Sequence, residues 1–227
     1  MLHQLNIFLH VLAGTLGMLI GIWVYRSKKG GAIHRKYGWI FLYLMGVVVT
    51  SALIGTTFFR DRPFLTVISL TSLYTTVSGF RVLKTRSSGF TTWDAAGMLL
   101  IAGFAIAFII NLENARILWH KSVIYYTLGS LLAIIAFDFI RFLKPKLIRY
   151  PFFWVYDHTY RMSSSFAALI SAGGGTIISD MGLGDYTQII PANLATLWLI
   201  FAMFYFPRRY IRKLNSPSAT KNVEKSF

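Results

Sequence analysis

Four histidines are the residues of this chain whose type and spacing most clearly could do chemistry. His10 lies about a turn into the first long apolar run, and His120 comes just before the fifth. His34 precedes the second run, and His158 lies about a turn and a half into the sixth. If these runs cross a membrane, two histidines lie near each face. This arrangement would suit two b-type haems, since each iron takes two axial imidazoles.

For two of these histidines the neighbouring residues favour a simpler interpretation. His34 stands between Ile33 and Arg35, and His120 stands between Trp119 and Lys121. Aromatic and basic residues gather where a membrane helix meets water. Taken by themselves, His34 and His120 are therefore interpreted as interfacial residues.

Charged residues inside the apolar runs form a second candidate site. Asp157 and Arg161 are four residues apart, and Asp138 and Arg141 are three apart, so each pair can meet on one helix face. If the two helices adjoin, these pairs and the histidines of the same end would form one polar cluster. Such a cluster could bind haem propionates, a proton, an anionic head group or a substrate.

Glycines accompany His10 along the first apolar run. Gly14, Gly17 and Gly21 follow His3 and His10 at steps of three, four and seven residues, which places all five on one helical stripe. Small residues at this spacing favour close helix packing. The alternative is that the missing side chains leave room beside the histidine for a flat ligand such as a porphyrin.

The composition indicates what must position these residues. Of 227 residues, 55% are hydrophobic and only 14% are charged, far below the roughly 25% charged residues of soluble domains. The net charge of +15 is carried by short loops between apolar runs, which indicates membrane topology and not nucleic-acid binding. Without cysteine, any metal must be held by histidine or oxygen. The N-terminus lacks a basic segment and a cleavage site, so no cleaved signal peptide is expected.

Seven apolar runs have the length of about 20 residues that a membrane helix needs. They are Leu5–Tyr25, Trp39–Thr57, Phe64–Leu83, Trp93–Ile110, Val123–Phe142, Phe153–Ile178 and Ile189–Phe206. Prolines punctuate the runs, and Pro207 is expected to follow the last one. We therefore expect an all-α polytopic membrane protein with seven transmembrane helices in residues 1–214. The polar stretch 215–227 is expected to be a disordered cytoplasmic tail.

Lysines and arginines predict the orientation. Basic residues gather after the first, third and fifth runs and after the last, whereas the other side has only Arg60, Arg62, Arg116 and Lys121. Because cytoplasmic loops are the basic ones, we expect the N-terminus outside and the C-terminus in the cytoplasm of an inner-membrane protein.

The polar motifs together resemble a family of predicted bacterial inner-membrane proteins with domain of unknown function 2306. The resemblance is carried by His10, Lys29-Gly30, His34-Arg35-Lys36-Tyr37-Gly38-Trp39, His120, and His158-x-x-Arg161-Met162-Ser163. The resemblance implies a multi-helix membrane protein. It also implies that His10, His34, His120, His158 and Arg161 are polar positions that recur among the members of the family. It implies no activity.

Two functions of different class follow from these residues. In the first, His10 and His120 hold an outer haem b and His34 and His158 an inner one, with Arg161 near the propionates, so that electrons cross the membrane from a quinol or another donor. In the second, Asp138, Asp157, His158 and Arg161 serve a transporter or ligand-binding protein through proton coupling or substrate capture. A membrane enzyme acting on lipids ranks third. The expected partners are the bilayer and a quinone or small-molecule ligand, without nucleic acid.

The charge distribution makes a direct prediction about topology. A reporter that is active only in the cytoplasm should be active when fused after Phe227 and inactive when fused after Asp185. The opposite pattern of activity would contradict the orientation.

Overall fold

The computed structural model describes residues 1–59, 63–86, 91–110, 121–144, 152–178, 182 and 186–214. Within these residues every regular element is a helix and there is no strand, which confirms the all-α prediction for this part of the chain. The elements are α1 (Leu2–Arg26), α2 (Ala32–Ile54), η1 (Gly55–Phe59), α3 (Pro63–Thr85), α4 (Thr92–Ile110), α5 (Lys121–Leu143), α6 (Phe153–Ile178) and α7 (Tyr186–Leu214). His120 and the expected tail at 215–227 lie outside the described residues.

Four helical stretches of the described residues are long and apolar enough to cross a membrane. They are Leu2–Arg26, Ala32–Phe59, Thr92–Ile110 and Ile189–Leu214. Large apolar side chains such as Phe8, Leu99 and Leu197 are exposed on these helices. An apolar outer face of this kind fits contact with lipid and not with water.

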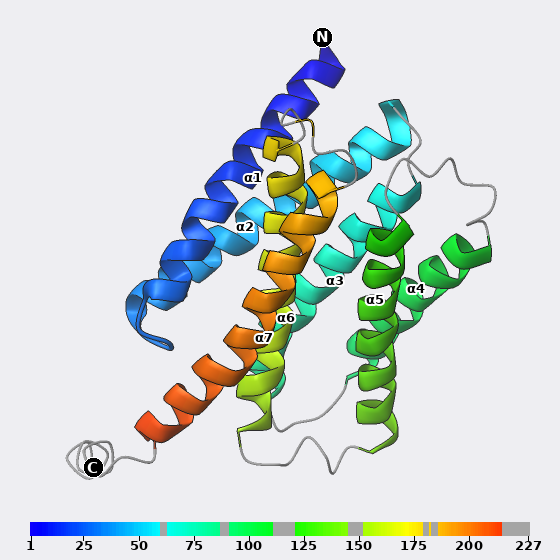
Figure 1. The fold of residues 1–227 in the computed structure, drawn as a ribbon. Coiled ribbons are helices and arrows are strands. Elements are labelled where there is room, and N and C mark those ends of the chain that lie inside the picture. Colours follow the sequence, from blue (N-terminus) through cyan, green and yellow to red (C-terminus); the bar gives the residue numbers. More distant parts are fainter. Residues whose placement is uncertain are drawn as a thin grey trace.

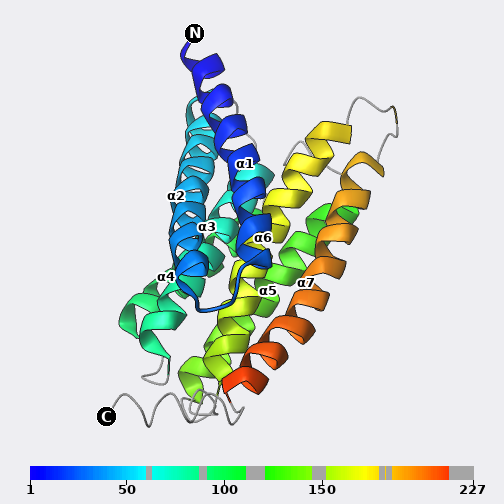
Figure 2. The ribbon, with the colours of Figure 1, turned by 90° about the vertical axis from the view of Figure 1, so that its left-hand side faces the viewer.

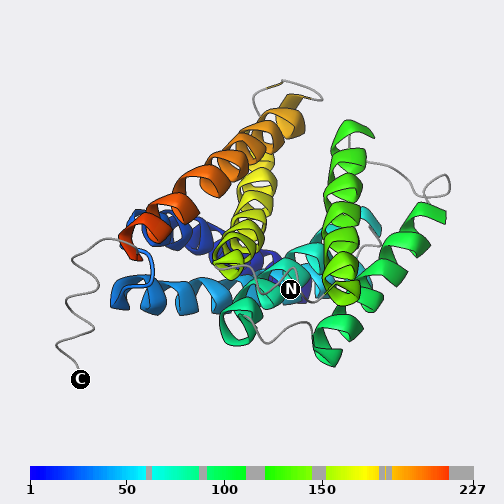
Figure 3. The same cartoon turned by 90° about the horizontal axis from the view of Figure 1, so that it is seen from below.

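The helices run alternately up and down and form two groups (Figure 1). In the first group α1 packs on α2, and α6 packs on α7; α1 also contacts α6. In the second, α4 packs on α5 and α3, and Figure 3 shows the green α4–α5 pair set to one side of the yellow α6 and the orange α7. Helix α3 joins the groups, because it also packs on α2 and α6.

The basic residues of the described chain gather at one end of the bundle, which we call the basic end. It contains the turn from α1 to α2, the ends of α3, α5 and α7 and the start of α6, and it is the lower end in Figures 1 and 2. Its lysines and arginines include those of residues 26–36, 81–86 and 208–213.

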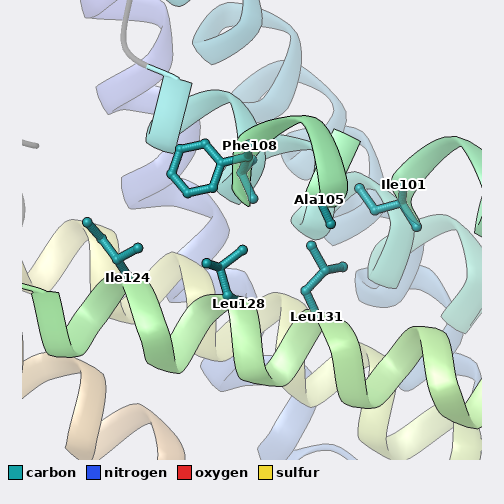
Figure 4. Packing of buried hydrophobic residues seen from close by; sticks show 7 residues of the cluster. Ile101, Ala105, Phe108, Ile124, Leu128 and Leu131 are labelled. Carbon is teal, nitrogen blue, oxygen red and sulfur yellow. The ribbon is translucent and has the colours of Figure 1, made fainter. Parts of the chain in front are cut away.

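Each group has its own hydrophobic core. Ile101, Ala105 and Phe108 of α4 face Ile124, Leu128 and Leu131 of α5, as Figure 4 shows, and Val67 of α3 completes this core. The other core joins α2 to α6 and contains Phe41, Met45, Phe166 and Leu169. The buried apolar side chains of the described residues therefore form two separate cores.

The glycine stripe of α1 provides space for side chains of α6. A Cβ atom on Gly17 would lie 3.1 Å from Leu169, and one on Gly21 would lie 2.2 Å from the ring of Phe166. Phe166 and Leu169 thus occupy the space beside these glycines, which supports close helix packing over room for a porphyrin along the stripe.

Helix α7 extends beyond the predicted end at Phe206. Pro191 and Pro207 both lie inside it, and the helix continues to Leu214. The prediction that Pro207 follows the helix is therefore wrong. Helices in protein bundles and membranes accept proline where neighbouring helices compensate for the lost hydrogen bond, and Pro207 is fully buried here.

Candidate functional site

Two aspartates and two arginines form a buried ion network between α5 and α6. We call it the Asp–Arg network, and its members are Asp138, Arg141, Asp157 and Arg161. Arg161 Nε lies 2.7 Å from Asp157 Oδ1, and Arg141 Nη1 lies 2.6 Å from Asp157 Oδ2. Arg161 Nη2 also pairs with Asp138 Oδ1, which Arg141 Nη1 approaches to 3.4 Å. The network therefore crosses from one helix to the other in both directions.

Helix α3 supplies further partners to the network. The Tyr74 hydroxyl donates to Asp138 Oδ2, and Arg161 Nη1 donates to the Ser78 hydroxyl at 2.8 Å. Gly79 lets α3 approach, since a Cβ atom there would lie 2.9 Å from Cβ of Arg161. Three helices thus meet at these charges.

The charges of the network balance. All four carboxylate oxygens accept a hydrogen bond, from the two guanidinium groups or from Tyr74. The four side chains are only 1% to 6% exposed. Charges this far from water are tolerated only when they are paired. Both carboxylates of the network are therefore already occupied.

The sequence predicted part of this arrangement. The pairs Asp157–Arg161 and Asp138–Arg141 are confirmed. The bonds from Arg141 to Asp157 and from Arg161 to Asp138 were not specified, and Tyr74 and Ser78 were not predicted at all. No spacing in the sequence could have indicated these partners, because they depend on how three helices pack.

A cavity of about 360 Å³ opens beside the network at the basic end. Its walls come from the last turns of α1, α3 and α7, the first turns of α2, and α6. Aromatic and aliphatic residues form most of the wall, among them Phe41, Trp154, Phe166, Phe206 and Tyr210. A volume of several hundred cubic ångströms with a few polar groups is typical of small-molecule sites.

His34 of α2 and His158 of α6 both line this cavity. Nδ1 of His158 lies 2.8 Å from the Gly79 carbonyl oxygen and so donates its proton there. Nδ1 of His34 lies 3.4 Å from the Val24 carbonyl oxygen. When Nδ1 carries the proton, Nε2 keeps its lone pair and can accept a hydrogen bond or bind a metal. The structure thus brings the two histidines of this end together.

Lys29 belongs to the same cavity, although the sequence did not single it out as a site residue. Its ammonium donates to the carbonyl oxygens of Val24 and Tyr25, both at 3.0 Å, and lies 4.2 Å from the centre of the Phe206 ring. Burial lowers the pKa of Lys29 to about 8. A cation held against apolar rings with little water gains from a nearby anion.

Of the other predicted histidine pair, only His10 lies within the described residues. Nδ1 of His10 lies 3.1 Å from the Val48 carbonyl oxygen and 3.0 Å from the Ser51 hydroxyl, so its ring is bonded to α2. His120 lies outside the described residues, and α5, which begins just after it, packs on α3, α4 and α7. The outer haem site remains a prediction.

Comparison of the chain with protein-family models, curated proteins and solved structures finds no significant match. The resemblance to proteins with domain of unknown function 2306 therefore stays a prediction. The functional argument depends on the geometry alone.

The Asp–Arg network makes a testable prediction about stability. Asp157→Ala should lower the stability by ~3–5 kcal/mol, because it leaves one buried arginine charge unbalanced. Adding Arg141→Leu should recover much of this loss, since Arg161 and Asp138 then remain as a neutral pair. The measurement is thermal unfolding in detergent.

The partly exposed pair between Arg81 and Asp94 provides the control. Arg81 is 33% exposed there, so Asp94→Ala should cause a much smaller loss than Asp157→Ala. Equal unfolding temperatures for the wild type and Asp157→Ala would show that the network is solvated.

Proposed function

We propose that the chain is a ligand-binding protein of the inner membrane that binds a small molecule in the cavity at the basic end. In this proposal seven helices cross the membrane, with the N-terminus outside and the basic end in the cytoplasm. Four apolar helices and the gathering of basic residues at one end support this topology. The remaining helices, α3, α5 and α6, carry the polar groups that face protein.

The convergence of polar groups on one apolar cavity carries the proposal. Most of its wall is apolar, while Lys29, His34, His158 and the hydroxyl of Ser163 reach it from α6 and from the α1–α2 region. The Tyr25 hydroxyl donates to Ser163 at 2.7 Å and so fixes the position of one polar group. A few positioned polar groups in an apolar pocket can orient a bound molecule.

In this proposal the Asp–Arg network supports the site and does not bind the ligand. Proton coupling through Asp138 or Asp157 would require a carboxylate to lose an arginine partner in a buried position. We therefore assign the network to holding α6 in place, while His158, on the same helix, faces the cavity.

Filling the cavity tests the proposal. Thr159 lines the cavity on α6, so Thr159→Trp should exclude the ligand. Ile177→Trp is the matched control, because Ile177 lies on the same helix and is 67% exposed. Native mass spectrometry of protein extracted from membranes should show a bound small molecule in the wild type and the control but not in Thr159→Trp. A bound molecule in Thr159→Trp as well as in the other two proteins, or no bound molecule in the wild type, would contradict the proposal.

Haem b is a second candidate for the ligand, supported by the two imidazoles in one cavity. His34 and His158 support this candidate because they line the cavity from different helices and each has Nδ1 near a carbonyl oxygen, which leaves Nε2 as the free ring nitrogen. Among the described residues no group of three or more acidic or histidine side chains could hold a metal ion, but a haem needs only two axial ligands. Haem bound there would supply one-electron transfer.

The absorption spectrum tests this candidate. Protein purified from haem-replete cells should show the sharp Soret band and the reducible α-band of bis-imidazole iron. His34→Ala and His158→Ala should each remove this spectrum, whereas His3→Ala should keep it, because His3 is exposed and contacts Phe59 instead. Colourless wild-type protein would contradict haem binding and leave the cavity for another ligand.

A further inference from the structure

Three basic side chains line the cavity, and no described residue of its lining is acidic. They are Lys29 in the turn between α1 and α2, Arg35 in the first turns of α2, and Arg86 at the end of α3. Elsewhere at this end a comparable side chain, Arg81, is paired with Asp94. The cavity therefore carries an excess of positive charge next to low-dielectric walls, where an anion is attracted most strongly.

We propose that the cavity binds an amphiphile whose anionic head group, a phosphate or carboxylate, lies among Lys29, Arg35 and Arg86, with its apolar body against the aromatic wall. This inference rests on the proposed ligand-binding function and names the chemical class of the ligand.

The helix ends around the cavity favour an anion as well. Lys29 covers carbonyl oxygens at the end of α1, which would otherwise repel a negative charge. Helix α2, which lines the cavity from His34 onwards, begins with Gly31 as its N-cap and without a side-chain cap. The positive end of its helix dipole therefore adds to the charge of Arg35 and Lys29.

The apolar residues of the cavity wall can contact the apolar body of such a ligand. Phe41, Phe166 and Met162 line the cavity between α2 and α6, and Phe206 lines it from α7. The Arg86 guanidinium lies 4.8 Å from the centre of the Trp154 ring, so a cation and an apolar surface stand side by side. A small hydrated anion would leave this apolar wall exposed, whereas an amphiphile would cover it.

Calorimetric titration with defined probes tests the inference. The probes are dihexanoyl phosphatidic acid, dihexanoyl phosphatidylcholine and inorganic phosphate. Wild-type protein should bind the phosphatidic acid at least about tenfold more tightly than the phosphatidylcholine, and added salt should weaken the difference. Inorganic phosphate should bind more weakly than the phosphatidic acid, because it leaves the apolar wall uncovered. If phosphate binds as tightly as the phosphatidic acid, the ligand is a soluble anion and the apolar body of the proposed ligand is overturned.

Replacing the two exposed arginines tests whether the positive charge of the cavity contributes to lipid binding without a change in folding. Arg35→Gln combined with Arg86→Gln leaves the hydrogen bonds of Lys29 intact and should weaken phosphatidic acid binding at least about tenfold. Lys36→Gln is the matched control, because Lys36 is exposed on the same helix turn and does not line the cavity. Equal unfolding temperatures for the variants and the wild type would show that folding is unchanged.

The outcomes distinguish this inference from the broader function. Equal affinity for the two lipids, or an unchanged affinity for phosphatidic acid in the arginine variant, overturns the inference that the head group is anionic. If Thr159→Trp still abolishes lipid binding in that case, the cavity remains a ligand site for a neutral molecule. If Thr159→Trp has no effect either, the ligand-binding function itself is overturned.

Discussion

The bundle depends on charges that have no access to water and must therefore satisfy one another. The two carboxylates and two guanidinium groups of the Asp–Arg network lie on α5 and α6, and α3 contributes Tyr74 and Ser78. Separating α5 from α6 would leave buried charges without their partners, at a cost of several kcal/mol, and removing α3 would leave Asp138 and Arg161 without the hydroxyls of Tyr74 and Ser78. The requirement for pairing thus connects α5 and α3 to α6. The two hydrophobic cores of the bundle are separate, one among α3, α4 and α5 and the other between α2 and α6.

The network also determines which face of α6 lines the cavity. Asp157 and Arg161 lie one turn apart and face α5 and α3, while His158, Met162 and Ser163 line the cavity. Because a helix turns about 100° per residue, fixing one face fixes the direction of the next. Gly21 of α1 receives the ring of Phe166 on the cavity side of α6. The cavity thus lies next to the buried Asp–Arg network, and its three basic side chains lie on more exposed segments.

Several features were predictable because they depend on local periodicity and on the solvent. The long apolar runs predicted the helices, and the four-residue spacing of Asp157 and Arg161 predicted their bond. The end of α7 was not predictable, since Pro207 is accommodated by burial among neighbouring helices. The surroundings of Lys29 were not predictable either, because nothing in its neighbours along the chain indicates that its ammonium lies against Phe206 and the α1 carbonyl groups.

The sequence by itself determined that the chain forms apolar helices with basic turns and buried charges, because hydropathy and spacing along one chain control those properties. Only the tertiary structure decided which charges meet between helices. It joined His34 and His158 in one cavity and left His10 bonded to α2. It also filled the space beside the glycine stripe with Phe166 and Leu169. The physical reason is that these contacts connect residues far apart in sequence, so they depend on the packing of helix faces in three dimensions.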